Sequence, residues 1–337
     1  MPAFTFLALL AFSAHEADAQ EPRFEERLEV SRVVVDARVV DPRGRPLLGL
    51  TPGDFRLRVD GQVVPLESVH WVAETAPVPE AAGIPSEPAE RPFVPRGRLI
   101  VLLFQKDLGG FRLPGLIRMK ERAAVFVDSL GPQDRAAVLI FDSHLRLFLD
   151  FTEDKREVQD VLRRRLLREW PKPVEAGPFP SLAAHLDREA ARRAASPETA
   201  LLVLARALKP LPGAKSVLFF GWGLGRLSGG QVLMDADYEP ARRALADARA
   251  AVFALDVSDA DYHTLEIALE KVAVDSGGFY MKTHDFPLLA MSLVEGALHG
   301  HYVLAFESPS RKRGLHALDV DLVGRKGTVL ARNTFLD

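Results

Sequence analysis

Two hydrophobic patterns follow one another along the chain. Between residues 33 and 72 apolar residues alternate with polar ones, as at Phe55, Leu57 and Val59, which predicts strands with one buried face. From Arg98 onward, short continuous apolar runs alternate with segments of helical period, which predicts strands buried on both faces and helices between them. The run 99–104 is the first such strand, and we expect it at the centre of a parallel sheet.

The second pattern predicts regular alternation of strands and helices. Strands are expected at residues 99–104, 136–141, 145–151, 215–220, 251–256 and 279–281. Helices are expected at residues 116–130, 152–168, 196–208, 238–250, 263–275 and 287–298. This order implies an α/β fold with a doubly wound, mostly parallel Rossmann-like sheet and right-handed crossovers. Ligands of such sheets bind at the carboxyl ends of the strands.

Outside this α/β domain, which we place at residues 98–300, the sequence predicts four further pieces. Residues 1–19 have an apolar stretch at 4–12 and end in Ala17-Asp18-Ala19, which predicts a signal peptide and a periplasmic or secreted protein. Residues 24–72 form a small N-terminal β module, and residues 301–337 form a C-terminal β extension. Residues 73–97 are rich in Pro, Ala and Glu and are predicted to be a linker.

Composition and charge exclude several functions. The 337 residues have a net charge of −3, which argues against a dedicated binder of nucleic acid or of an anionic membrane surface. No segment of the sequence is apolar and long enough to predict a membrane-spanning helix. The chain has no cysteine, so it has neither disulfides nor thiolate metal sites.

Several segments resemble a known family. "VVVDARVVDPRGRPLLGLTPGDFRLRVDGQ", "LGPQDRAAVLIFDSHLRLFLDFTED", "LPGAKSVLFF", "AVDSGGFY" and "HYVLAFESP" occur in the order found in bacterial secreted VWFA-related proteins. The predicted order of elements, with the second and third strands adjacent, is similar to that of the von Willebrand factor type A (VWA) domain. The resemblance spans residues 30–335 and implies a VWA sheet flanked by β segments.

The resemblance also implies a metal-ion-dependent adhesion site, but here its motif is degenerate. The family uses D-x-S-x-S after the first strand, a Thr from a later loop and an Asp after the fourth strand. Gln105, Asp107 and Gly109 stand at the first three positions, Thr199 is the nearest Thr, and Trp222 lies at or beside the position of the last Asp.

A hard divalent cation needs several oxygen ligands, and these positions supply few. Lys106 also places a positive charge where the cation would sit. We therefore expect no cofactor and no tight Mg²⁺ site. The weak candidates for metal ligands are Gln105, Asp107 and Asp142.

The predicted function is metal-independent binding of another protein, of unknown identity, through loops at the carboxyl edge of the sheet. The residues expected on this partner-binding rim are Gln105, Lys106, Asp107, Asp142, Ser143, Trp222 and Arg226. Trp and Arg are frequent interface hot spots. Trp222 could instead fill the space of the missing metal, and the sequence leaves both roles open.

Two other functions remain alternatives: a structural subunit of an envelope assembly, and an adhesion domain with weak divalent-metal binding. An enzyme is not expected. The glycines of Gly221-Trp222-Gly223-Leu224-Gly225 resemble a dinucleotide loop but lead into Leu227-Ser228-Gly229-Gly230 instead of a helix. The sequence contains neither G-x-S-x-G nor H-E-x-x-H.

An acidic segment after the fifth strand is a further candidate site. Its members are Asp256, Asp259, Asp261 and His263. Because they lack the spacing of a calcium loop, they are predicted to be a solvated loop that caps the next helix.

Overall fold

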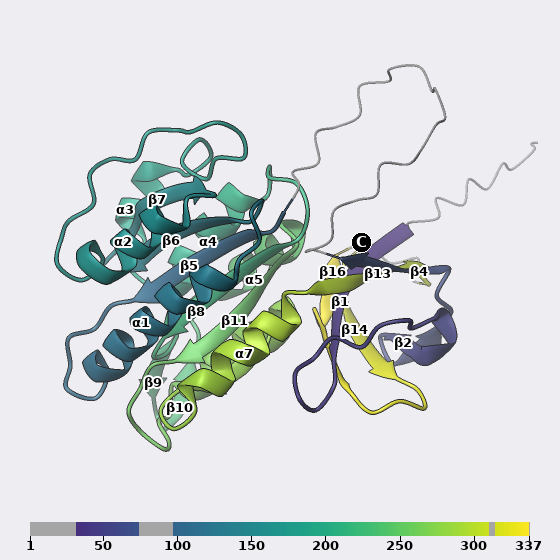
Figure 1. The fold of residues 1–337 in the computed structure, drawn as a ribbon. Coiled ribbons are helices and arrows are strands. Elements are labelled where there is room, and N and C mark those ends of the chain that lie inside the picture. The colour runs from purple at the N-terminus through teal and green to yellow at the C-terminus, as the bar shows by residue number, and fades with distance from the viewer. Residues whose placement is uncertain (1–31, 74–96, 310–313, 337) are drawn as a thin grey trace, which may run out of the picture. The chain divides into compact units, whose positions relative to one another are not determined.

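The computed structural model of this chain describes residues 32–73, 97–309 and 314–336 (Figure 1). The expected signal peptide at 1–19 lies outside the described residues, and so does nearly all of the expected linker. None of the helices in the described ranges is long and apolar enough to cross a membrane.

A six-stranded sheet forms the centre of the α/β domain, in the order β12-β11-β8-β5-β6-β7. Its strands are β5 (Leu99–Gln105), β6 (Arg135–Phe141), β7 (Leu145–Thr152), β8 (Lys215–Gly221), β11 (Ala250–Asp256) and β12 (Tyr280–Lys282). Only β7 is antiparallel to its neighbour. The prediction of a mostly parallel α/β sheet with β5 at its centre is therefore confirmed.

Helices cover both faces of this sheet (Figure 1). They are α1 (Leu113–Ser129), α2 (Lys155–Asp160), α3 (Arg188–Arg193), α4 (Pro197–Leu208), α5 (Tyr238–Asp247), α6 (Glu266–Ser276) and α7 (Pro287–Ala297). Alternate residues of β5 face opposite ways, because successive side chains of a strand point to opposite faces. Val101 packs with α4, α5 and α6, whereas Leu102 packs with α1, α2 and α7.

Two local predictions need correction. The second helix was expected to be capped by Thr152, with Glu153 and Asp154 in its first turn, but it begins at Lys155 and is capped by Asp154. The Asp154 carboxylate accepts hydrogen bonds from the backbone N–H of Arg156 (2.9 Å) and Glu157 (3.3 Å). After α2 the chain forms a short π-helical segment, Val161–Arg165, instead of a continuing α-helix. The sequence did not predict α3.

The N-terminal and C-terminal β segments pair with each other in two four-stranded sheets, ordered β15-β1-β13-β4 and β16-β14-β2-β3. The strands are β1 (Arg32–Val40), β2 (Phe55–Val59), β3 (Gln62–Val64), β4 (Ser68–Ala73), β13 (Gly300–Glu307), β14 (Leu315–Leu322), β15 (Thr328–Ala331) and β16 (Thr334–Leu336). Thus the pieces that the sequence separates at 24–72 and 301–337 share both sheets.

Candidate functional site

The connections that leave the carboxyl ends of the strands form one edge of the six-stranded sheet, at the lower left of Figure 1. We call this set of loops the carboxyl-edge rim; it comprises residues 106–112, 142–144, 222–237, 257–265 and 283–286. The loop at 222–237 contains a hairpin of β9 (Arg226–Ser228) and β10 (Gln231–Leu233). Loops at this edge bind ligands in open α/β sheets.

Gln105 ends β5 below the rim and is only 2% exposed. Its carboxamide Nε2 donates to the carbonyl of Gly223 (2.9 Å). Its Oε1 accepts from the backbone N–H of Trp222 (2.9 Å) and of Gly223 (3.3 Å). The amide therefore joins β5 to the loop after β8. Because Gln105 is buried, it supports the rim instead of facing a partner.

Asp107 and Arg112 form an ion pair within the loop after β5. The Asp107 carboxylate also accepts from the backbone N–H of Gly109 (2.7 Å). Burial raises the pKa of Asp107, but the Gly109 N–H and the Arg112 guanidinium outweigh it and hold the pKa below its usual value. The carboxylate is thus ionised and already neutralised by a fixed cation.

The Arg112 guanidinium also stacks on Trp222, with its central carbon 3.5 Å from the ring centroid. Trp222 is half-buried and packs against the core on the α1 and α7 side of the sheet. Its indole Nε1 has no hydrogen-bond partner among the described residues. The ring therefore lies between the Arg112 guanidinium and the core. This position fits the second role considered for Trp222, that of filling the space of the missing metal.

The remaining predicted rim residues lie on three loops: Lys106 on the loop after β5, Asp142 and Ser143 on the loop after β6, and Arg226 on the loop after β8. Asp142 pairs with Arg146 and accepts from the backbone N–H of Ser143 (2.6 Å), so its carboxylate has partners of its own. No hydrogen bond or ion pair joins it to Asp107 among the residues that the structure describes. Lys106 is half-buried, and Arg226 is exposed at the start of β9.

Thr199, the nearest candidate for the threonine of the family motif, lies in the first turn of α4. Its hydroxyl donates to the carboxylate of Asp237 (2.7 Å). The neighbouring Glu198 is fully buried and accepts from the backbone N–H of Gly225 (2.6 Å) and of Asp235 (3.4 Å). Burial raises the pKa of Glu198 above its usual value. Helix α4 therefore anchors both ends of the hairpin loop.

Large apolar side chains are exposed on several loops of the carboxyl-edge rim, and the sequence reasoning missed them. They are Leu108, Phe111, Leu227, Leu233, Tyr262 and Phe286. Phe111 is 79% exposed. The hairpin that holds two of them has a detectable signal, the Gly229-Gly230 pair, whose φ angles of 58° and 79° suit a two-residue turn. Nothing comparable in the sequence shows that the other four side chains are exposed.

A pocket of about 290 Å³ opens on the rim between the loop after β5 and the loop after β11. It is lined by Gly109, Gly110, Phe111, Arg112, Ser258, Ala260 and His263. Phe111 and Arg112 contribute an aromatic ring and a cation from one side, and His263 contributes an imidazole from the other. The rim is therefore hollowed next to its most exposed aromatic residue.

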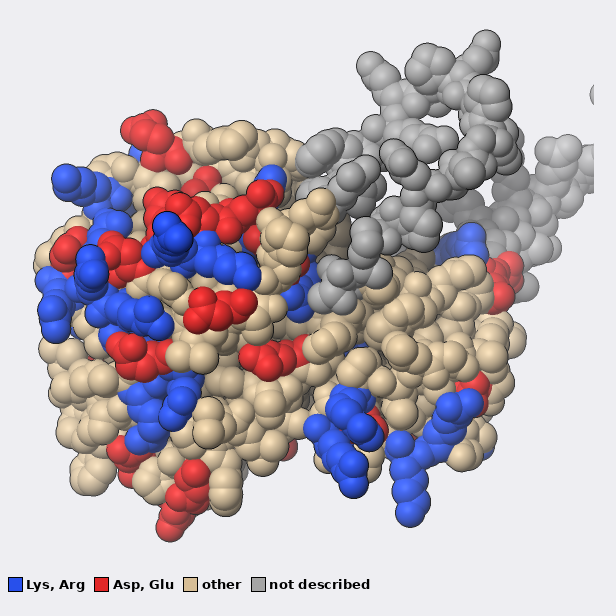
Figure 2. Space-filling view, viewed as in Figure 1, with Lys and Arg blue, Asp and Glu red and all other residues tan. Residues whose placement is uncertain are grey.

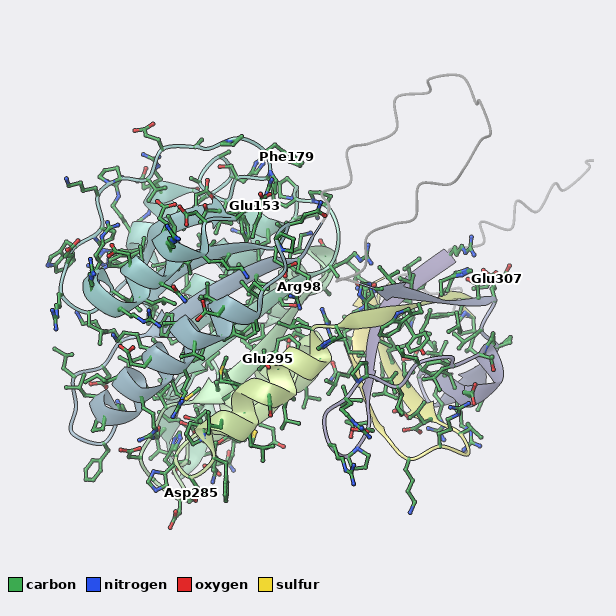
Figure 3. All side chains as sticks on the ribbon, in the orientation of Figure 1. Arg98, Glu153, Phe179, Asp285, Glu295 and Glu307 are labelled. Atoms are coloured by element: carbon green, nitrogen blue, oxygen red, sulfur yellow. The ribbon has the colours of Figure 1, made fainter. Side chains whose placement is uncertain are left out.

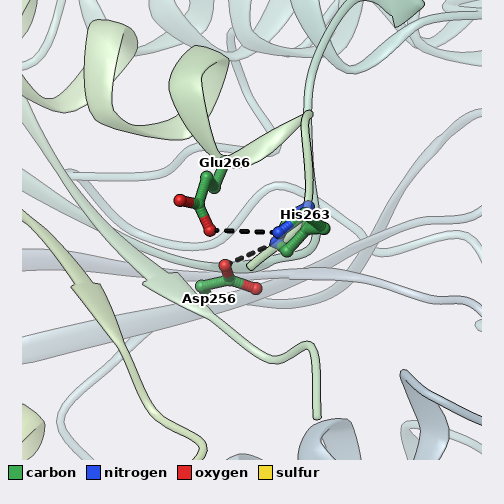
Figure 4. Close-up of side chains that lie close together, drawn as sticks. All are labelled: Asp256, His263 and Glu266. Carbon is green, nitrogen blue, oxygen red and sulfur yellow. Dashed lines mark hydrogen bonds and ion pairs between the residues drawn. The ribbon is translucent and has the colours of Figure 1, made fainter. Parts of the chain in front are cut away.

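In the acidic segment after β11, Asp261 is exposed and Asp259 and His263 are half-buried, but Asp256 does not lie in a solvated loop (Figure 4). Asp256 is buried and accepts from the Tyr280 hydroxyl (2.9 Å), from the backbone N–H of Ser258 (2.9 Å) and from His263 Nε2 (2.7 Å). Burial raises the pKa of Asp256, but these hydrogen bonds outweigh it and lower the pKa. For Asp256 the prediction was wrong, because Tyr280 on the adjacent strand covers its carboxylate.

Among the described residues, Asp256, His263 and Glu266 form a group whose possible metal-ligand atoms all lie within 4.8 Å of one another. Glu266 also pairs with the Lys282 ammonium (2.9 Å), and its carboxylate accepts from the backbone N–H of His263 (3.3 Å). A metal would have to displace both this ammonium and the hydrogen bond between His263 and Asp256. The contacts present hold the loop between β11 and α6 in place.

Comparison with solved structures finds neighbours of low sequence identity. No protein-family model and no curated protein matches the chain. A von Willebrand factor type A structure from Catenulispora acidiphila is 11% identical, with a TM-score of 0.42 over 91% of this chain and 72% of that one. An aerotolerance-related membrane protein from Bacteroides fragilis is 12% identical, with a TM-score of 0.39 over 60% of this chain and 98% of that one. The PilB minor pilin from Streptococcus sanguinis (D319A mutant) is 10% identical, with a TM-score of 0.38; this chain covers 62% of it, and 61% of this chain is matched.

Proposed function

We propose that this chain is an exported VWA-like protein-interaction module that binds another protein through the carboxyl-edge rim. The observation that carries this proposal is the set of large apolar side chains exposed on the rim, on loops after β5, β8, β11 and β12. These loops all lie at the same edge of the sheet, and large apolar groups exposed on one edge supply the material of an interaction surface. Arg112, which is paired with Asp107 and stacked on Trp222, lines a nearby pocket that a partner side chain can enter.

We further propose that this binding needs no metal. Gln105 has its carboxamide committed to the loop after β8, and Asp107 is committed to Arg112. Neither residue offers a free anionic oxygen, and Asp142 pairs with Arg146 on another loop. A hard divalent cation needs such oxygens, so this donor set does not fit the site that the family resemblance implies.

Addition of saturating Mg²⁺ or Mn²⁺ is therefore expected to leave the melting temperature unchanged, because a ligand of the native state alone would raise it by mass action. Thermal denaturation with and without the cation measures this. A clear rise in melting temperature that Asp107→Ala abolishes would contradict metal independence.

The partner-binding proposal is tested by capture from the native exported fraction. Phe111→Ser is expected to weaken the captured complex about 30-fold or more, since a hot-spot aromatic contributes about 2 kcal/mol or more. The matched control is Phe179→Ser (Phe179 is labelled in Figure 3), because Phe179 is 48% exposed and its carbonyl accepts from the Arg135 side chain (3.2 Å), at the amino end of β6. Equal losses from both variants, or no loss from Phe111→Ser, would contradict the proposal.

A further inference from the structure

Helices α1 and α7 pack side by side on one face of the sheet and leave a groove of about 370 Å³ between them. Its floor is formed by the buried side chains of Phe126 and Met291. Its walls carry Val125, which is 54% exposed, and Leu288, which is 63% exposed. Figure 2 shows the surface over α7 as mostly uncharged. The groove is therefore apolar, open and unfilled by the rest of the described chain.

One charge of each sign borders this groove. Arg122 lies on the α1 wall and Glu295 on the α7 wall, where Figure 3 labels it. Neither side chain has an ion pair or a side-chain hydrogen bond within the described ranges, although most of the charged side chains around them are paired. These two groups are thus available to a partner of opposite charge.

We propose that the groove is the interface of a homodimer, in which a second copy of this chain packs its α1 and α7 against the first. In a twofold-symmetric contact the same patch meets itself, so every pairing occurs twice. Such a rotation brings Arg122 of one copy opposite Glu295 of the other. It also brings the exposed apolar side chains of the two grooves together. A surface with a cation on one wall and an anion on the other is complementary to itself in charge.

Charge reversal tests this pairing in the full chain. Arg122→Glu and Glu295→Arg are each expected to raise the dissociation constant of the dimer about 100-fold or more, because each puts like charges together at two symmetric positions. The double variant reverses both walls and is expected to restore dimerisation. Sedimentation velocity over a concentration series measures the dissociation constants.

Two controls separate the proposal from a general loss of structure. Arg206→Glu reverses an exposed arginine on α4, outside the groove, and is expected to leave the dimer unchanged. Circular dichroism of each variant reports whether the fold is retained. A monomeric wild type over the whole concentration series would overturn the proposal, because the groove would then have no second copy in it. Single reversals that leave a dimer intact, or a double variant that stays monomeric although folded, would overturn it as well.

Discussion

Replacement of Asp134 by alanine is expected to lower the free energy of unfolding by about 3–5 kcal/mol. The Asp134 carboxylate is buried and pairs with the buried guanidinium of Arg98, at the start of the central strand β5. It also accepts from the backbone N–H of Arg98 (2.9 Å) and of Gly131 (2.6 Å). Arg98 in turn donates to the carbonyl of Leu298 (3.0 Å). The substitution leaves a buried cation without its counter-charge, which is why the expected loss is large.

Urea denaturation measures this loss, and Asp319→Ala is the matched control. Asp319 pairs with Arg58 (2.6 Å) on the surface of the β segments, where an ion pair contributes about 1 kcal/mol or less. Losses of similar size from the two variants would contradict the view that burial makes the Asp134 pair important.

The same pair predicts a dependence on pH. Burial raises the pKa of Asp134, but the hydrogen bonds and charge of Arg98 outweigh it, so the pKa is lower in the folded than in the unfolded chain. Its stabilisation is therefore complete at neutral pH and is lost below about pH 4, as the pH falls through the folded-state pKa. We expect Asp134→Ala to flatten the fall in stability over that acidic range.

Trp222→Ala is expected to lower the free energy of unfolding by about 3 kcal/mol, as truncation of a large packed side chain does. The ring packs on the core, and the Arg112 guanidinium covers it. The sequence left two roles open for Trp222, contact with a partner and filling the space of the missing metal. This geometry favours the second role.

Phe111→Ala is the comparison that separates a space-filling role of Trp222 from a partner-binding one, because Phe111 is exposed on the same rim. We expect it to change the free energy of unfolding by less than about 1 kcal/mol, as surface substitutions do, while weakening partner capture. Chemical denaturation of both variants measures the difference. If Trp222→Ala were as stable as Phe111→Ala and failed to capture the partner, Trp222 would be a contact residue instead.

The sheet could be predicted from the sequence because a continuous apolar run such as 99–104, followed by a segment of helical period, is typical of a strand buried on both faces. The pairing of β1 with β13 could not, because these strands are separated by the whole α/β domain and their patterns show only that each has a buried face. Pairing partners are set by tertiary contacts that a local pattern does not contain.

The candidate site was less predictable than the fold. Gln105 was expected on the loop after the first strand, but it is the buried last residue of β5. Its role depends on backbone N–H groups of Trp222 and Gly223 that only the folded sheet brings to it. Phe111 was overlooked because a single aromatic residue in a loop has no periodicity to show whether it is exposed. Asp256 was expected in solvent because its cover, Tyr280, comes from the adjacent strand.

The central claim, that the carboxyl-edge rim binds a protein partner, is tested most directly by site-specific photo-crosslinking in the native exported fraction. A photoreactive residue is placed at position 111 on the rim or, as the control, at position 179 at the other end of the sheet. We predict that position 111 forms a discrete crosslinked complex with another protein and that position 179 does not. Crosslinks of equal yield from both positions, or from position 179 alone, would contradict the claim.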